Sequence, residues 1–434
     1  MSGVVDAMRI GFLLLRDTFF KTMGELIEAS VERGHTALLL YSEETAGGPK
    51  AYQQVTKEKL APFAKLGGKG TPFQLSELAQ LKEKFQLDVL VTHEGYYFLT
   101  GHLKDLGMSR REGVLAVSLS HFYENIRHPL ESLLYFDKTY YLSDFSVDTH
   151  FAIANGGKRR EEFAGLYEAS GSPMFDQLMG LKRDEARREL GIPEGKRVVV
   201  FFAPVIVRET RWRHLILRHS SRIERIKRVL KAGKWRYVWA ALTSPDLLEI
   251  AQAIREFCDR NNAYLIIKSR AKQTGNDIFD QIADRYMTGE NDSYYPVFTS
   301  YKLLASADLC ITAMSMSALE GVATGVPVWN IYIPYSEYEA PAARESHGRQ
   351  YFRAVMGRDK EGPFNYRDCV TNIDPKRVLG VLRRKSLTEA FVDPQAAREY
   401  ARLFLGIKRE PSSERILNSL EQLYATRPRT EQKG

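Results

Sequence analysis

One run of residues, 307–330, constrains the fold of this 434-residue chain more than any other. It consists of a short apolar strand (Leu309–Thr312), a tight turn with two serines, a short helix, and a second strand after Gly325-Val326-Pro327. Short apolar strands joined by helices indicate a parallel sheet that is covered on both faces. A helix that begins where such a strand ends presents free N–H groups and its positive dipole end above the sheet. That position suits a phosphate.

The polar residues of this turn allow two interpretations. In the first, Ser315 and Ser317 hold a phosphate, and Glu320, one helical turn further on, holds a ribose. In the second, Ser317-Ala318-Leu319-Glu320 is a capping box that satisfies the first helical N–H groups. The box alone favours capping, whereas the return to a strand directly after Gly325-Val326-Pro327 favours the ligand site.

The run resembles the donor-nucleotide segment of the two-domain GT-B glycosyltransferases. It is also similar to the same segment of their relatives, the nucleotide-sugar 2-epimerases and the CDP-glycerol glycerophosphotransferases. The turn-rich stretches 171–176 and 190–196 resemble the hinge and the lead into the nucleotide domain of that family. The resemblance implies an α/β GT-B fold with two doubly wound, Rossmann-like domains that face a central cleft. The donor would bind to the C-terminal domain and the acceptor to the N-terminal domain.

Length and patterning agree with two domains. We predict an N-terminal acceptor-binding α/β domain at 1–175 and a nucleotide-donor-binding α/β domain at 176–388. C-terminal helices follow at 389–434, and the resemblance implies that they cross back to the N-terminal domain. The predicted strands are Arg9–Leu15, Thr36–Tyr41, Asp88–Thr92, Val114–Leu119, Lys138–Leu142, Arg197–Ala203, Tyr264–Lys268, Leu309–Thr312 and Pro327–Ile331.

Composition excludes several classes of protein. No stretch approaches the ~20 apolar residues needed to span a bilayer, and the run Ile10–Leu15 is too short for a signal-peptide core. The three cysteines are far apart with no C-x-x-C pair, which argues against a disulfide framework or structural zinc and predicts a cytoplasmic protein. No G-x-G-x-x-G motif follows the first strand and no Walker loop occurs, so nicotinamide-type and P-loop chemistry lack their usual support. The nine histidines lack metal-ligand spacing, so we predict no metal and no cofactor apart from the donor substrate.

Other residues of the second domain point to the same edge of its sheet. Lys268 ends an apolar strand, where it either pairs with phosphate or simply ends the strand in solvent. Pro204 closes another strand, and Arg208 follows it closely. The glycerophosphotransferases carry Lys-Pro-His-Pro where this chain has Lys268 followed by Ser-Arg-Ala. They also have Asp-Tyr-Ser-Ser where it has Ala313-Met314-Ser315-Met316. Both departures favour a nucleotide sugar over CDP-glycerol as the donor.

The candidates for a catalytic base follow strands of the first domain. His93 and Glu94 come after the strand that ends at Thr92, and His121 comes after the next predicted strand. Relatives have a histidine at the place of His121, which makes it the preferred base, although a lone histidine in a loop is also common on plain surface. Asp17 is a further candidate, with the alternative that it caps the helix beginning near Thr18.

The segment 208–236 is strongly basic, and Glu209 and Glu224 are its only acidic residues. Apolar residues, including Trp212, occur within it at helical spacing. Such a segment either lies on an anionic membrane surface or forms a solvated helix that covers the sheet. No nucleic-acid motif accompanies it. Its basic residues are Arg208, Arg211, Arg213, Arg218, Arg222, Arg225, Lys227, Arg228, Lys231, Lys234 and Arg236.

The resemblance implies a glycosyltransferase that moves a sugar from a nucleotide-activated donor to an acceptor. Surface polysaccharide or glycolipid assembly is expected for the acceptor from the resemblance and the basic segment alone. The expected partners are the donor and a glycan or lipid-linked acceptor. If the basic segment contacts lipid, the enzyme is peripheral on the inner face of the cell membrane. Three alternatives stay open: a CDP-glycerol-type glycerophosphotransferase, a nucleotide-sugar 2-epimerase, and a non-catalytic glycan-binding GT-B protein.

Overall fold

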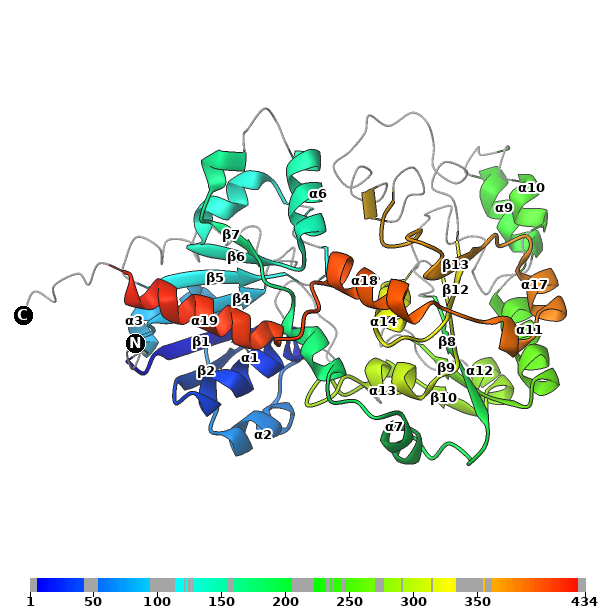
Figure 1. Cartoon of the computed structure of the whole chain (residues 1–434), viewed down its shortest axis with the longest axis horizontal. Helices are drawn as coiled ribbons and strands as arrows, with labels where there is room; N and C mark the ends of the chain where they lie inside the picture. Colours follow the sequence, from blue (N-terminus) through cyan, green and yellow to red (C-terminus); the bar gives the residue numbers. More distant parts are fainter. Residues whose placement is uncertain are drawn as a thin grey trace, which may run out of the picture. The chain divides into compact units, whose positions relative to one another are not determined.

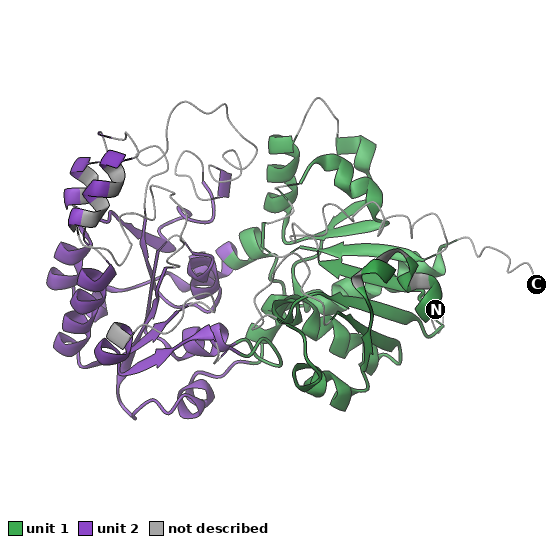
Figure 2. Cartoon of the chain, turned by 180° about the vertical axis from the view of Figure 1, so that it is seen from behind, with its two compact units in different colours: residues 1–180, 293–298, 401–434 green, residues 181–292, 299–400 purple. Residues whose placement is uncertain are grey.

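The chain forms two compact units (Figures 1 and 2). Unit 1 contains residues 1–180, 293–298 and 401–434, and unit 2 contains residues 181–292 and 299–400. No described helix is long and apolar enough to cross a membrane. The computed structural model describes residues 6–42, 54–93, 114–120, 122–123, 126, 128–154, 160–204, 222–231, 235, 238–243, 245, 247–269, 277–289, 292–313, 315–332, 354–355 and 361–427.

Unit 1 is built on a seven-stranded parallel sheet with the order β3-β2-β1-β4-β5-β6-β7. The strand order reverses between β1 and β4, which is the topological switch point where ligands bind in doubly wound sheets. Strands β1, β2, β4 and β5 are almost continuously buried, as expected for a sheet covered on both faces. The strands are β1 (Arg9–Leu14), β2 (Thr36–Tyr41), β3 (Lys69–Pro72), β4 (Val89–His93), β5 (Leu115–Leu119), β6 (Lys138–Tyr141) and β7 (Tyr167–Ala169).

The helices of unit 1 come from both ends of the chain. The C-terminal helix α19 packs against α1, and Figure 1 shows the two lying beside the same sheet. Three side chains of α19 are fully buried in the core that it shares with α1: Ile416, Leu417 and Leu420. The helices are α1 (Phe20–Glu32), α2 (Lys57–Leu66), α3 (Leu81–Phe85), α6 (Asp144–Ala154) and α19 (Ser412–Ala425).

Polar contacts fix α19 at two places. At its N-terminus the Asp176 carboxylate accepts hydrogen bonds from the backbone N–H groups of Ser412 (2.8 Å) and Ser413 (2.7 Å). A negative charge is favourable there because it faces the positive end of the helix dipole. Further along, Glu421 accepts a hydrogen bond from Arg33 at 2.9 Å, and it lies 3.0 Å from Nε2 of His35.

Residues 293–298 are a short excursion of the chain into unit 1. The ring of Tyr295 stacks on Phe63 with 4.4 Å between centroids, and its hydroxyl donates to Glu28. Gly24 permits this approach, because a Cβ there would lie 2.3 Å from the Tyr295 ring. The Lys21 ammonium lies 4.2 Å from the centroid of the Phe298 ring. The domain ranges expected from the sequence do not include this excursion.

Unit 2 repeats the architecture with a six-stranded parallel sheet in the order β10-β9-β8-β11-β12-β13. Its strand order reverses between β8 and β11. Together the two sheets confirm the predicted fold class, two doubly wound α/β domains. The strands are β8 (Arg197–Phe202), β9 (Ala263–Lys268), β10 (Arg285–Met287), β11 (Leu309–Thr312), β12 (Val328–Ile331) and β13 (Val370–Ile373).

Helices cover both faces of the second sheet. α11 and α17 pack on one face, where they share a core with β8, β9 and β11. α13 and α14 cover the other face, and Gly321 of α14 lies so close that a Cβ there would be 2.7 Å from Val328. The helices are α7 (Arg183–Glu189), α9 (Arg222–Lys231), α10 (Val238–Thr243), α11 (Leu247–Arg260), α12 (Asp277–Ile282), α13 (Thr299–Ser306), α14 (Ser317–Ala323), α17 (Val378–Arg384) and α18 (Pro394–Leu405), the last of which contains the unit boundary.

Candidate functional site

A row of five side chains, four of them polar, lies across the sheet of unit 2 where its strands end. The strand register pairs Lys268 with Phe202, Phe202 with Thr312, Thr312 with Asn330, and Asn330 with Asn372. Residues opposite each other on neighbouring strands point to the same face of the sheet. Cys310, two residues before Thr312, lies under Gly321 of α14, so the whole row points to the face that α13 and α14 cover.

Three of the four polar members of the row are bonded to other groups inside the protein. The Lys268 ammonium lies 2.6 Å from Oδ1 of Asp292, and these two side chains are only 5% and 7% exposed. Nδ2 of Asn330 donates to Oδ1 of Asn372 at 2.8 Å, and Nδ2 of Asn372 donates to the Phe364 carbonyl at 2.5 Å. Lys268 therefore does not end its strand in solvent, as one interpretation of the sequence expected.

The hydroxyl of Thr312 is the exception. Thr312 is fully buried, and among the residues that the structure describes its Oγ1 has no hydrogen-bond partner. A buried polar group without a partner costs about 1–3 kcal/mol. An unsatisfied donor at the C-terminal end of a central strand, next to the switch point of the sheet, is therefore a candidate ligand contact.

The serine turn after β11 differs from the prediction in one respect. The predicted free N–H groups of the short helix already have acceptors within the turn. The Ser317 N–H donates to Ser315 Oγ (3.3 Å), that of Ala318 to the Ser315 carbonyl (3.0 Å), and those of Leu319 and Glu320 to the Met316 carbonyl (2.9 and 3.2 Å). α14 has only seven residues, so the helix dipole and N–H groups alone do not make this turn an anion site.

The capping-box interpretation also fails. α14 begins at Ser317, so the capping residue is Met316, and it makes no side-chain cap hydrogen bond. The hydroxyls of Ser315 and Ser317 lie 3.1 Å apart and both residues are half-buried. Glu320, one turn into α14, is 3% exposed. Burial, together with the nearby charge of Glu320, raises the pKa of the Cys310 thiol beneath the helix.

The other described residues that the sequence predicted near the phosphate also lie where the strands of unit 2 end. Pro204 directly follows β8, and the N–H of the preceding Ala203 donates to the Lys268 carbonyl at 3.0 Å. The structure therefore places Lys268, Pro204, Ser315 and Ser317 at the ends of three adjacent strands of one sheet. Arg208 lies outside the described residues.

In unit 1 the described base candidates lie at the switch point. His93 is the last residue of β4, is 4% exposed, and stacks on Phe19 with 4.4 Å between ring centroids. Asp17, just after β1, is 5% exposed and lies 2.5 Å from the Lys59 ammonium. The helix cap at this point is Arg16, so Asp17 is not the cap.

The other two predicted bases, Glu94 and His121, lie outside the described residues. Within the described ranges, no group of three His, Cys, Asp or Glu side chains is arranged to hold a metal ion.

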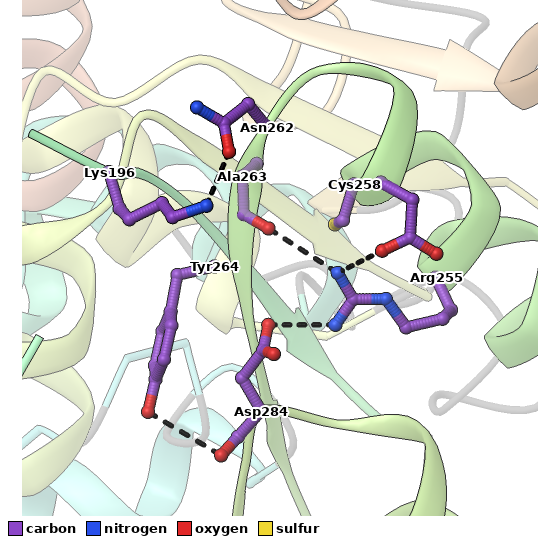
Figure 3. Close-up of a pocket in the computed structure, with 8 residues that line it drawn as sticks. Lys196, Arg255, Cys258, Asn262, Ala263, Tyr264 and Asp284 are labelled. Atoms are coloured by element: carbon purple, nitrogen blue, oxygen red, sulfur yellow. Dashed lines mark hydrogen bonds and ion pairs between the residues drawn. The ribbon is translucent and has the colours of Figure 1, made fainter. Parts of the chain in front are cut away.

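A polar pocket of about 250 Å³ occurs elsewhere in unit 2, and Figure 3 shows the residues around it. Arg255 at its centre lies 2.6 Å from Asp259 and 2.7 Å from Asp284, and burial raises the pKa of Cys258 to about 12. Asp284 also accepts a hydrogen bond from the N–H of Leu265 at 2.7 Å. These residues precede or begin the strands, so the pocket lies at the amino edge of the sheet, opposite the edge where such folds bind ligands. Its charges hold the ends of helices and strands together.

Comparisons with known proteins address the fold. The sequence matches no protein-family model and no curated protein. A putative UDP-N-acetylglucosamine 2-epimerase from Listeria monocytogenes is 12% identical over 98% of both chains, with a TM-score of 0.54. The UDP-GlcNAc 2-epimerase from Neisseria meningitidis, bound to UDP-GlcNAc, is 10% identical over 96% of this chain and 100% of its own, with a TM-score of 0.56. The wall teichoic acid polymerase TagF is 11% identical over 97% of this chain and 90% of its own, with a TM-score of 0.53.

These identities are too low to transfer an activity, but the matches extend over nearly the whole chain. Both sheets, their strand orders and these neighbours agree with the fold implied by residues 307–330. The chain has the two-domain GT-B fold that nucleotide-sugar 2-epimerases share with TagF.

Proposed function

We propose that unit 2 binds a nucleotide-activated sugar at the carboxyl edge of its sheet, and that the protein is a GT-B glycosyltransferase. The acceptor would belong to surface polysaccharide or glycolipid assembly. The observation that carries this proposal is the buried polar row at that edge, above all the unsatisfied hydroxyl of Thr312 next to the serine turn. A buried hydroxyl at this place is best explained by a polar ligand that it contacts.

Two proteins of the same fold support a nucleotide as the ligand. One is the N. meningitidis epimerase bound to UDP-GlcNAc, and the other is S. aureus MnaA in a co-structure with UDP, with TM-scores of 0.56 and 0.51. In the proposed complex, Ser315 and Ser317 donate their hydroxyls to the diphosphate and Glu320 accepts from the ribose. Lys268 supplies the positive charge, for which it must exchange Asp292 for phosphate.

For transfer, we propose that a side chain of unit 1 serves as the base. A base removes the proton from the acceptor hydroxyl while the acceptor oxygen bonds to the sugar carbon, and the bond from that carbon to the nucleoside diphosphate breaks. The serine hydroxyls and Lys268 stabilise the charge on the departing diphosphate. His121 remains the proposed base, with the pair His93 and Glu94 as the alternative.

A 2-epimerase is the second candidate. The observation that supports it is the fold, which the Listeria epimerase shares over 98% of both chains. Such an enzyme would use the same nucleotide site without an acceptor. CDP-glycerol transfer is less favoured because the residues after Lys268 and around Ser315 depart from that family's pattern.

The test has two stages. Thermal shift with nucleoside diphosphates and their sugars should identify a ligand that stabilises the protein, and the same ligand should stabilise the Thr312→Val variant less. The protein is then incubated with that donor, and the products are followed by NMR and mass spectrometry. A same-mass isomer formed without acceptor would identify an epimerase instead. Stabilisation by no nucleotide at all would contradict the donor site itself.

A further inference from the structure

Exposed apolar side chains are concentrated in one part of unit 2. Of the seven large apolar side chains that are exposed among the described residues, four lie between residues 223 and 242. The other three lie elsewhere in the sequence, at positions 134, 179 and 391. Concentrated exposure of this kind indicates a binding surface, whereas single exposed residues do not. The four are Ile223 (65% exposed), Trp235 (71%), Trp239 (70%) and Leu242 (39%).

The geometry of α9 and α10 accounts for this exposure. The two helices pack against each other, as Figure 1 shows. One side of each helix contacts the rest of unit 2. Ile226 of α9 and Val238 of α10 pack against the core of the unit. On α10, Trp239 and Leu242 are three residues apart and therefore share a face.

Basic residues accompany the apolar ones. Between 222 and 243 the chain has seven lysines and arginines and one acidic residue, Glu224, a net charge of +6 against +8 for the whole chain. Lys227 and Lys231 are exposed on α9, and Lys227 follows the exposed Ile223 by one helical turn. The surface formed by α9, Trp235 and α10, called here the α9–α10 surface, therefore presents the lysines Lys227 and Lys231 beside exposed apolar side chains.

We infer that the α9–α10 surface docks on an anionic lipid bilayer. Tryptophan favours the headgroup region, where its ring is buried and its N–H stays solvated. Isoleucine and leucine can enter the acyl boundary, and lysines stay among anionic headgroups. A nucleic acid would satisfy the lysines and could stack on tryptophan, but it would leave Ile223 and Leu242 without an apolar partner.

The position of the surface links it to the candidate site. The chain leaves the end of β8, forms α9 and α10, and returns through α11 to the beginning of β9. The α9–α10 surface therefore lies toward the carboxyl edge of the unit 2 sheet, the edge that carries Lys268 and the serine turn. Docking there would bring this edge to the membrane, although it does not depend on the transfer reaction proposed above.

The experiment measures binding of the full chain to vesicles by co-sedimentation. The vesicles are phosphatidylcholine alone, or phosphatidylcholine with phosphatidylglycerol. Wild type should bind only the anionic vesicles. Trp235→Ala/Trp239→Ala and Lys227→Glu/Lys231→Glu should each weaken binding by about tenfold or more, because apolar contact and charge contribute separately. Binding should also fall between ~0.1 M and ~1 M salt as the Debye length shrinks.

Matched controls test whether binding depends on the α9–α10 surface or on any exposed apolar or charged side chain of unit 2. Phe391→Ala removes a side chain of equal exposure (71%), and Lys376→Glu/Arg383→Glu reverses two exposed charges elsewhere in unit 2. Both should bind like wild type. Tryptophan emission gives a second readout: of the four tryptophans Trp329 is buried, so vesicles should shift the emission of the exposed ones to the blue. If the double tryptophan variant unfolds at lower temperature, Trp235→Ser alone replaces it, because Trp235 lies outside both helices.

Three results would overturn the inference. One is a wild-type protein that does not sediment with anionic vesicles. Another is equal binding to neutral vesicles. The third is a tryptophan variant that binds like wild type while the charge-reversal variant loses binding, which would point to an anionic polymer such as RNA.

Discussion

Lys268 and Asp292 form an ion pair inside unit 2, with 2.6 Å between Nζ and Oδ1 and both side chains nearly inaccessible to solvent. Removing one partner of a buried pair typically costs about 3–5 kcal/mol, whereas replacing both partners with apolar residues is often neutral. Lys268→Met should therefore lower the melting temperature, and Lys268→Met/Asp292→Leu should recover most of the loss. If Lys268 contacts phosphate, the double variant should still fail to bind nucleotide in calorimetry. Recovered affinity would assign Lys268 a purely structural role.

Thr312→Val tests the unsatisfied hydroxyl. The change keeps the shape of the side chain and removes a buried polar group without a partner, so the free protein should become more stable by about 1 kcal/mol. Nucleotide affinity should fall because the proposed ligand contact is lost. Thr139→Val is a matched control, since Thr139 of β6 is also fully buried with an unsatisfied hydroxyl among the described residues. It should stabilise the protein to a similar extent, as measured by urea unfolding, without changing nucleotide affinity.

Glu320→Gln tests the proposed ribose contact. It keeps the size of the side chain but removes its charge, and loss of a charge-assisted hydrogen bond should weaken nucleotide binding by about tenfold. Glu256→Gln, an exposed change on α11 of the same unit, serves as the control. Calorimetric titration measures the nucleotide affinity of both variants. If the two affinities are equal, Glu320 does not contact the nucleotide.

Glu25 gives a prediction for pH dependence. Burial, and then the charges of Glu28, Asp176 and Glu32, raise its pKa from 4.5 to about 8. The folded protein therefore binds this proton more tightly than the unfolded chain, so stability should fall as pH rises from 4.5 to about 8 and level off above that.

Glu25→Gln should flatten this dependence by an amount of the order of a few kcal/mol, because one pKa unit is worth about 1.4 kcal/mol. The flattening would appear in melting temperatures of wild type and variant measured from pH 4.5 to about 8. Parallel curves for the two proteins would mean that Glu25 is solvated.

The sequence predicted all nine interior strands and none of the four edge strands, β3, β7, β10 and β13. Interior strands are continuous apolar runs because both faces are covered. Edge strands have only three or four residues, and most of their residues are not fully buried, so nothing in their pattern distinguishes them from loops. The contact between Asn330 and Asn372 needs an edge strand and its register, which explains why it was missed.

The sequence also predicted only part of the candidate site. Apolar strands ending in Lys268 and Thr312 predicted where polar groups emerge, and the structure places both at one edge. The prediction of free helical N–H groups was wrong because a serine hydroxyl and two carbonyl groups of the turn itself accept them. The stack of His93 on Phe19 depends on two strands brought together at the switch point, which no local pattern encodes.

The excursion of Tyr295 and the docking of α19 have a consequence for how the protein is made. During synthesis the first 180 residues emerge without the ring that packs on Phe63 and without the apolar face of α19. Unit 1 can therefore close its core only after residue 420 has left the ribosome, when unit 2 is already complete in sequence. A nascent chain arrested before α19 should expose apolar surface and recruit chaperones, and a fragment that ends at residue 180 should not fold alone.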